Sequence, residues 1–98
     1  MFDNSISLLA GQYGRCYVSG RALTVGNMEC HHKKPKSMGG GDDYRNLAWL
    51  VYEVHKLVHA VDEKIIKYYS EGLNLDEKGV KRLNYLRKLV GNSEINFN

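Results

Sequence analysis

The chain has 98 residues, a length that fits one small domain with a modest hydrophobic core. Apolar residues make up 43% and charged residues 26%, as in ordinary soluble globular proteins, and the net charge of +3 is compatible with a nucleic-acid partner. The two cysteines, Cys16 and Cys30, are too few for a disulfide framework or a four-thiolate zinc site. They indicate reduced thiols in a cytoplasmic protein, with a single disulfide as the alternative.

We expect neither a signal peptide nor a membrane-spanning segment. The first residues, "MFDNSISLLAG", lack a basic region and a long apolar run. No stretch of the chain approaches the roughly 20 apolar residues that a membrane span needs.

The first half of the chain predicts a short helix, a strand pair and a loop. Residues 3–14 begin with capping-type residues and end at a glycine, which is typical of a short helix. Residues 15–25 and 27–34 are rich in strand-forming residues and predict an antiparallel pair, with two adjacent histidines near the end of the second strand. Residues 35–46 hold the only proline and three consecutive glycines, which indicates a mobile loop.

The second half predicts three helices. Apolar residues at helical spacing form one stripe, made by Val51, Val54, Leu57, Val58 and Val61. They predict a helix over about 52–60. Residues 62–72 and 76–91 each begin at an aspartate and end at a glycine, and predict two further helices. The tail, 92–98, is expected to fray.

All four histidines lie on elements that can face one another. His55 and His59 are one helical turn apart, so two ring nitrogens can point at one ion, on a face about 130° from the apolar stripe. His31 or His32 can supply a third ligand, which would leave coordination positions open as in catalytic metal sites. Neighbouring strand residues point to opposite faces, so the other histidine is left as a free imidazole suited to take a proton from water. The alternative is that the histidines are incidental surface or core residues.

At these residues the sequence resembles the HNH endonucleases, also called ββα-metal or His-Me finger nucleases. The matching residues are His31-His32-Lys33-Lys34-Pro35, Gly39-Gly40-Gly41-Asp42, Asn46-Leu47, His55 and His59. The wider wording, "GRCYVSGRAL" and "NLAWLVYEVHKLVHA", is most similar to the C-terminal HNH domain of bacterial group II intron reverse transcriptases.

The resemblance implies an α+β fold with a ββα-metal core, made of a two-stranded antiparallel hairpin and a helix. An N-terminal helix and C-terminal helices would flank this core. We expect residues 1–98 to form a single domain, with the core over about 15–60 and a helical extension over about 62–92.

The resemblance also implies a role for each motif residue. His31, His55 and His59 match the metal ligands, and His32 matches the general base that activates water. Asn46 matches the asparagine that ties the loop to the catalytic histidine and sets its orientation.

One departure from the family concerns a second, structural zinc held by two CxxC pairs in many members. Here Ser19 replaces the partner of Cys16, and Val51 and Val54 stand where the second pair would fall. We therefore expect no structural zinc. Apolar packing should hold the strand pair instead, around Tyr17, Val18, Leu23 and Trp49, with both cysteines as small buried residues.

The implied activity is hydrolysis of DNA phosphodiester bonds to 5′-phosphate and 3′-hydroxyl ends with one divalent metal. Three imidazoles favour zinc or another transition metal, while magnesium or manganese can support turnover at an open site. Lys33, Lys34, Lys36 and Arg45 border the motif and are expected to contact phosphates. No element that reads bases is recognisable.

The resemblance further implies second-strand nicking for a group II intron mobility protein, with an attached reverse transcriptase and intron RNA as partners. Two alternatives stay open. One is a non-catalytic, metal-stabilised nucleic-acid-binding module, and the other is a small helical interaction domain.

Overall fold

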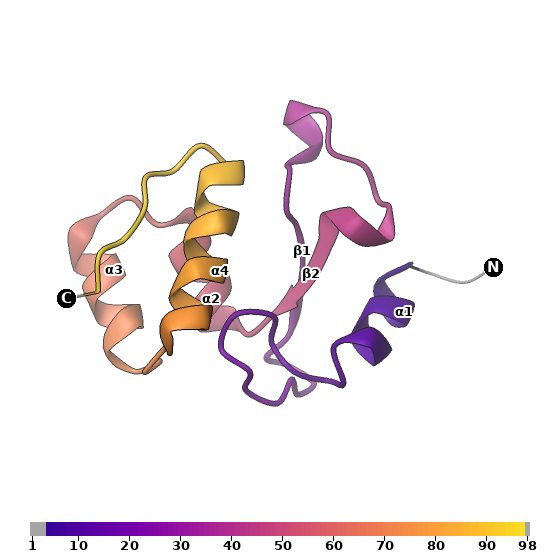
Figure 1. The fold of residues 1–98 in the computed structure, drawn as a ribbon, viewed down its shortest axis with the longest axis horizontal. Coiled ribbons are helices and arrows are strands. Elements are labelled where there is room, and N and C mark those ends of the chain that lie inside the picture. Colours follow the sequence, from indigo (N-terminus) through magenta and orange to yellow (C-terminus); the bar gives the residue numbers. More distant parts are fainter. Residues whose placement is uncertain (1–3, 98) are drawn as a thin grey trace.

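A computed structural model describes residues 4–97, which form an α+β fold (Figure 1). Three helices, α2, α3 and α4, group at one side of a two-stranded sheet, and α1 lies at the other side. The elements in chain order are α1 Asn4–Gly11, β1 Glu29–His32, the 3-10 turns η1 Lys36–Met38 and η2 Tyr44–Asn46, β2 Leu47–Leu50, α2 Tyr52–His59, α3 Glu63–Glu71 and α4 Glu77–Leu89. None of the helices in this described part is long and apolar enough to cross a membrane. Asp3, the start of the predicted first helix, lies outside the described residues.

The expected ββα core is present, but its first strand differs from the prediction. β1 pairs antiparallel with β2, in a register that sets His31 opposite Ala48 and His32 opposite Leu47. The predicted partner, 15–25, forms only isolated bridges, one of them between Arg15 and Ala22. Gly20 within it, and Gly14 and Gly26 at its two ends, have positive φ, whereas the apolar run "LAWL" is almost fully buried and makes the better strand.

Helix α2, which carries His55 and His59, is only eight residues long and is held at both ends by other segments. At its start, Asn27 Oδ1 accepts a hydrogen bond from the Tyr52 N–H at 2.8 Å. At its end, the buried Arg87 donates to the Leu57 and Ala60 carbonyls, the latter at 2.8 Å. Asn92 Nδ2 donates to the Val58 carbonyl at 2.8 Å. These contacts satisfy backbone groups that a helix end leaves unpaired.

The hydrophobic core lies between α2, α4 and the sheet. Four residues of the apolar stripe predicted for α2 are buried in this core. The fifth, Val61, lies beyond the end of the helix and is 76% exposed. The buried apolar set is Cys16, Val18, Ala48, Leu50, Val51, Val54, Leu57, Val58, Leu73, Leu83 and Leu86. Tyr17 and Leu23 pack against this core as expected, and Cys30 is only half-buried. Trp49 instead binds α1, because its indole N–H donates a hydrogen bond to the Ser5 carbonyl at 2.6 Å.

The two C-terminal helices begin where the sequence predicts. Asp62 Oδ1 accepts from the Lys64 N–H at 2.8 Å and Asp76 Oδ1 from the Gly79 N–H at 2.7 Å. The prediction of a frayed tail was wrong, because Asn84 exchanges two hydrogen bonds with the backbone of Ile95 at 2.8 and 3.0 Å. These bonds hold the tail against α4.

Candidate metal centre

Three imidazoles converge where β1 faces α2. His31 comes from the strand, and His55 and His59 come from successive turns of the helix. Their ring centroids lie 5.0 to 5.4 Å apart, and one ligand atom from each lies within 4.8 Å of the others. Three nitrogens so close together can contact a single ion, because histidine–metal bonds are about 2.0–2.1 Å long.

The state of His31 fits a metal ligand. Its side chain is 3% exposed, and its buried Nε2 has no hydrogen-bond partner among the residues described. Burial lowers its pKa from 6.5 to about 3, with further lowering from His55 and His59. The ring is therefore neutral at physiological pH and keeps a lone pair, as metal binding requires. An unpartnered buried nitrogen costs free energy that a bound ion would recover.

A carboxylate behind His55 orients the second ligand. Glu29 Oε1 lies 2.7 Å from His55 Nδ1, and both side chains are partly exposed. A carboxylate only accepts hydrogen bonds, so Nδ1 carries the proton and Nε2 keeps the lone pair for an ion. Sequence reasoning missed Glu29. The available signal was its position two residues before His31, which places both on one face of β1.

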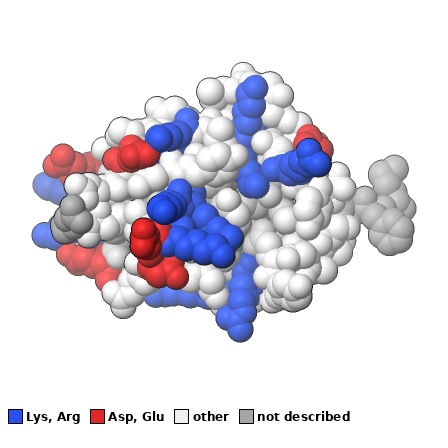
Figure 2. Space-filling model, viewed as in Figure 1, with Lys and Arg blue, Asp and Glu red and all other residues white. Residues whose placement is uncertain are grey.

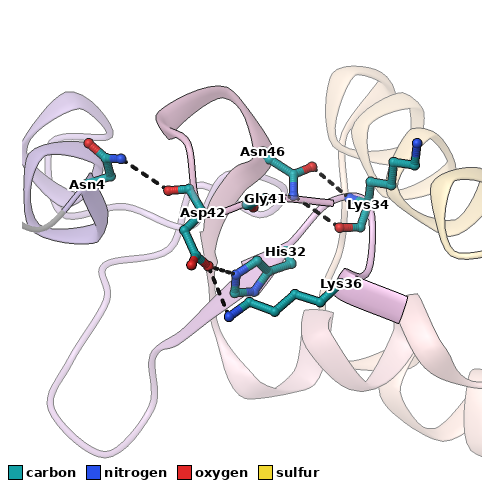
Figure 3. Close-up of polar contacts among 7 residues, drawn as sticks. All are labelled: Asn4, His32, Lys34, Lys36, Gly41, Asp42 and Asn46. Atoms are coloured by element: carbon teal, nitrogen blue, oxygen red, sulfur yellow. Dashed lines mark hydrogen bonds and ion pairs between the residues drawn. The ribbon is translucent and has the colours of Figure 1, made fainter. Parts of the chain in front are cut away.

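His32 lies on the opposite face of β1, toward the glycine-rich loop (Figure 3). Its Nε2 is 2.7 Å from Asp42 Oδ1, and Lys36 Nζ is 3.3 Å from the same oxygen. These two hydrogen bonds, His32 first, hold the pKa of the exposed Asp42 carboxyl below its usual value. Asp42 therefore stays ionised and accepts from Nε2–H, which leaves Nδ1 of neutral His32 able to take a proton. Asp42 is a second site residue that sequence reasoning did not assign.

Asn46 joins the end of β1 to the loop through backbone atoms (Figure 3). Its Oδ1 accepts from the Lys34 N–H at 2.9 Å, and its Nδ2 donates to the carbonyls of Lys34 at 3.0 Å and Gly41 at 2.8 Å. The Asn46 carbonyl accepts from the Lys33 N–H at 2.7 Å. Asn46 thus fixes both ends of the segment that connects His32 to Asp42, just after His32 and just before Asp42.

Gly40 is required for this close approach. A Cβ at this position would lie 1.8 Å from the Lys34 carbonyl oxygen and 2.9 Å from Asn46 Nδ2. The first distance is far inside van der Waals contact with backbone, so any side chain would displace the loop. At least one glycine of the "GGG" run is therefore structural.

The four predicted phosphate-contacting residues are in different environments. Lys33 Nζ lies 5.1 Å from the centre of the Tyr17 ring, and burial followed by the Arg82 charge lowers its pKa. Lys36 pairs with Asp42, and Lys34 and Arg45 are exposed. Figure 2 shows that Lys and Arg side chains are spread over this face of the molecule, with several gathered near its middle.

The fold and the site together define an α+β domain whose ββα core positions three histidines to hold a metal ion. A segment of 42 residues, 43% of the chain, is 45% identical to the probable mobile endonuclease C of Enterobacteria phage T4. The matched segment spans 20% of the length of that phage protein. No family model matches the chain, and no solved structure matches it. The chain is thus a partial homologue of a phage mobile endonuclease.

Proposed function

We propose that the chain is an HNH endonuclease domain that hydrolyses DNA phosphodiester bonds to 5′-phosphate and 3′-hydroxyl ends with one divalent metal. The observation that carries the proposal is the three-imidazole cluster, in which the buried His31 Nε2 has no partner. The partial likeness to a protein named a mobile endonuclease supports the nuclease activity.

His31, His55 and His59 would hold the ion, and His32 would act as general base. A divalent ion bound there would supply Lewis-acid stabilisation of the charge that develops on the phosphate and the leaving oxygen. His32 Nδ1 would take the proton of the attacking water while Asp42 holds the ring and stabilises its charged form. Attack and departure occur on opposite sides of phosphorus, which suits ligand and base side chains that diverge from neighbouring residues of β1.

The other predicted site residues would position the substrate and the base. Asn46 would act through the backbone that it holds just after His32 and just before Asp42. Lys33, Lys34, Lys36 and Arg45 would contact phosphates. The ligand set, three neutral imidazoles, favours zinc or another transition metal in the purified protein, with magnesium or manganese also able to support turnover.

We further propose that residues 1–98 act as one domain, with the core over about 15–60 and an extension over about 62–92. The natural setting proposed is second-strand nicking for a group II intron mobility protein. A 3′-hydroxyl end can prime DNA synthesis, which suits an attached reverse transcriptase. The likeness of "GRCYVSGRAL" and "NLAWLVYEVHKLVHA" to the HNH domain of group II intron reverse transcriptases supports this setting.

Nicking of supercoiled plasmid by the metal-loaded chain tests the proposal. The wild type should nick with a divalent metal and stop when EDTA is added. His32→Ala should retain stoichiometric metal and lose about 10²- to 10⁴-fold in rate, whereas His55→Ala should lose both metal and cleavage. Wild-type cleavage by His32→Ala would remove His32 as base.

The second candidate is a metal-stabilised nucleic-acid-binding module without turnover. It is favoured by the same histidine cluster, since a small core gains stability from a bound ion. Metal-dependent plasmid binding without any nicking by the wild type would establish it. Uptake below about a tenth of an equivalent of zinc would instead leave a plain interaction domain.

A further inference from the structure

Three tyrosines meet where α2 packs against α3. Tyr52 opens α2, and Tyr68 and Tyr69 lie on α3. The ring centroids of Tyr52 and Tyr69 are 6.1 Å apart and those of Tyr68 and Tyr69 are 5.0 Å apart, both pairs in edge-to-face geometry. Tyr52 is 41% exposed and Tyr68 is 73% exposed, so aromatic surface is left open to a ligand.

These tyrosines line a pocket of about 460 Å³, together with Arg21 and Glu53. That volume lies within the range of small-ligand sites, about 300–1,000 Å³. Glu53 Oε2 is buried and has no hydrogen-bond partner among the described residues. A carboxylate oxygen in this state can accept a hydrogen bond from an N–H group of a ligand.

Of the two pocket residues on α2, Tyr52 lies near the face that carries His55 and His59, and Glu53 lies about 140° around the helix from it. At 100° per residue, Tyr52 lies about 40° around the helix from the mean direction of His55 and His59, and about 4.5 Å along the axis from His55. Lys56 Nζ lies 5.5 Å from the centre of the Tyr52 ring, which adds a cation beside the aromatic surface. Tyr69 and Tyr52 share a hydrogen bond that raises the pKa of the Tyr69 phenol.

We propose that Tyr52, Tyr68 and Tyr69 form a stacking site for an unpaired nucleobase of the DNA strand held at the metal centre, with Glu53 accepting from its exocyclic amino group. Open tyrosine rings stack on bases of any sequence, and a carboxylate accepts from the N4 amino group of cytosine. Thymine has no exocyclic amino group and can donate only its ring N3–H. The proposal rests on the proposed nuclease function, and it adds a preference for unpaired, amino-bearing bases beside the cut.

The test measures binding by the full chain in EDTA, so that it does not depend on cleavage. The probes are a single-stranded oligonucleotide containing 2-aminopurine, its duplex, and oligo(dC) and oligo(dT) of equal length. The variants are Tyr52→Leu with Tyr68→Leu, and Glu53→Leu. Tyr13→Leu is the matched control, because Tyr13 is 88% exposed and follows α1, away from the pocket.

The double tyrosine variant should bind the single strand about tenfold more weakly and lose the quenching of 2-aminopurine, with the duplex affinity unchanged. The Tyr13 control should match the wild type. The wild type should bind oligo(dC) more tightly than oligo(dT). The Glu53→Leu variant should bind the two oligonucleotides with equal affinity.

Equal single-strand binding by the double variant and the wild type would overturn the stacking site, as would equal loss on single strand and duplex. Equal binding of oligo(dC) and oligo(dT) by the wild type would overturn the role of Glu53. Plasmid nicking by the wild type keeps the proposed function whatever these results are. Absent nicking with intact stacking would remove the nuclease and leave a single-strand-binding site.

Discussion

The two faces of β1 carry adjacent histidines in opposite environments. Toward α2, His31 is 3% exposed, its Nε2 has no hydrogen-bond partner among residues 4–97, and its pKa is lowered to about 3 by burial. Toward the loop, His32 is partly exposed and paired with Asp42 at 2.7 Å. The two imidazoles thus differ in state because their surroundings differ. One ring keeps a lone pair by desolvation, and the other is oriented by a carboxylate.

The largest effect that separates the two faces is expected from Gly40→Ala. The new Cβ would lie 1.8 Å from the Lys34 carbonyl oxygen, so the loop must move and take Asp42 from His32. We expect a loss of about 1–3 kcal/mol of stability in urea unfolding and a large loss of nicking, with zinc stoichiometry unchanged. Gly72→Ala is the matched control, since nothing lies within 4 Å of its Cβ. Loss of zinc in Gly40→Ala would show that the two faces are not independent.

Glu29→Gln should weaken metal binding on the α2-facing side of β1 and leave the His32 side unchanged. The amide can donate as well as accept, so it no longer fixes the proton on His55 Nδ1. We expect metal affinity to fall about 10- to 100-fold, measured by competition with a chelator. Unchanged affinity would mean that Glu29 does not orient this ligand. Glu94→Gln is a suitable control, because Glu94 pairs with Lys88 at 2.7 Å in the C-terminal part of the chain.

Asp42→Asn should affect only the side of β1 that carries His32 and faces the glycine-rich loop. Its carboxylate is exposed, so we expect a smaller loss, about tenfold in nicking rate, with metal affinity unchanged. Asp43→Asn provides the neighbouring control, since the Asp43 side chain makes no capping hydrogen bond. If Asp42→Asn and Asp43→Asn nicked equally fast, Asp42 would have no part in orienting His32.

The smallest effect is expected in the pH dependence of the metal-free protein. An unfolded histidine titrates near pH 6.5, whereas folded His31 has a pKa of about 3. Between these values the unfolded chain binds a proton that the folded chain does not, so lowering the pH favours unfolding. The Tm should therefore fall from pH 7 to pH 5, and fall less in His31→Gln. A Tm that rises over this range would contradict the buried, neutral state of His31.

The sequence was sufficient for what depends on spacing and local signals. Helical periodicity and terminal aspartates predicted α2, α3 and α4, and the i, i+4 spacing predicted that His55 and His59 share a face. The fold class was confirmed, with β1 paired to β2 in place of 15–25. The wrong partner arose because a four-residue apolar run gives no clear period, so "LAWL" was assigned to no element between the predicted loop and the predicted helix.

What the sequence could not supply were contacts between distant residues. Glu29 reaches His55 across 26 positions, and Arg87 reaches Leu57 across 30. A carboxylate on a strand or a cation on an amphipathic helix gives no local signal of such a partner. Glu29 orients the His55 ring, and this contact was therefore visible only in the fold.

The contacts that hold the ends of α2 decide whether the histidine motif can keep its geometry outside this fold. A helix of eight residues is marginal by itself in water, and here Arg87 and Asn92 provide the donors that its last carbonyls need. Those two residues lie about 30 positions beyond the motif. A graft of residues 15–60 onto another scaffold would carry all four histidines and lack the contacts that hold α2 in place. The structural unit that positions these histidines is therefore larger than the sequence motif.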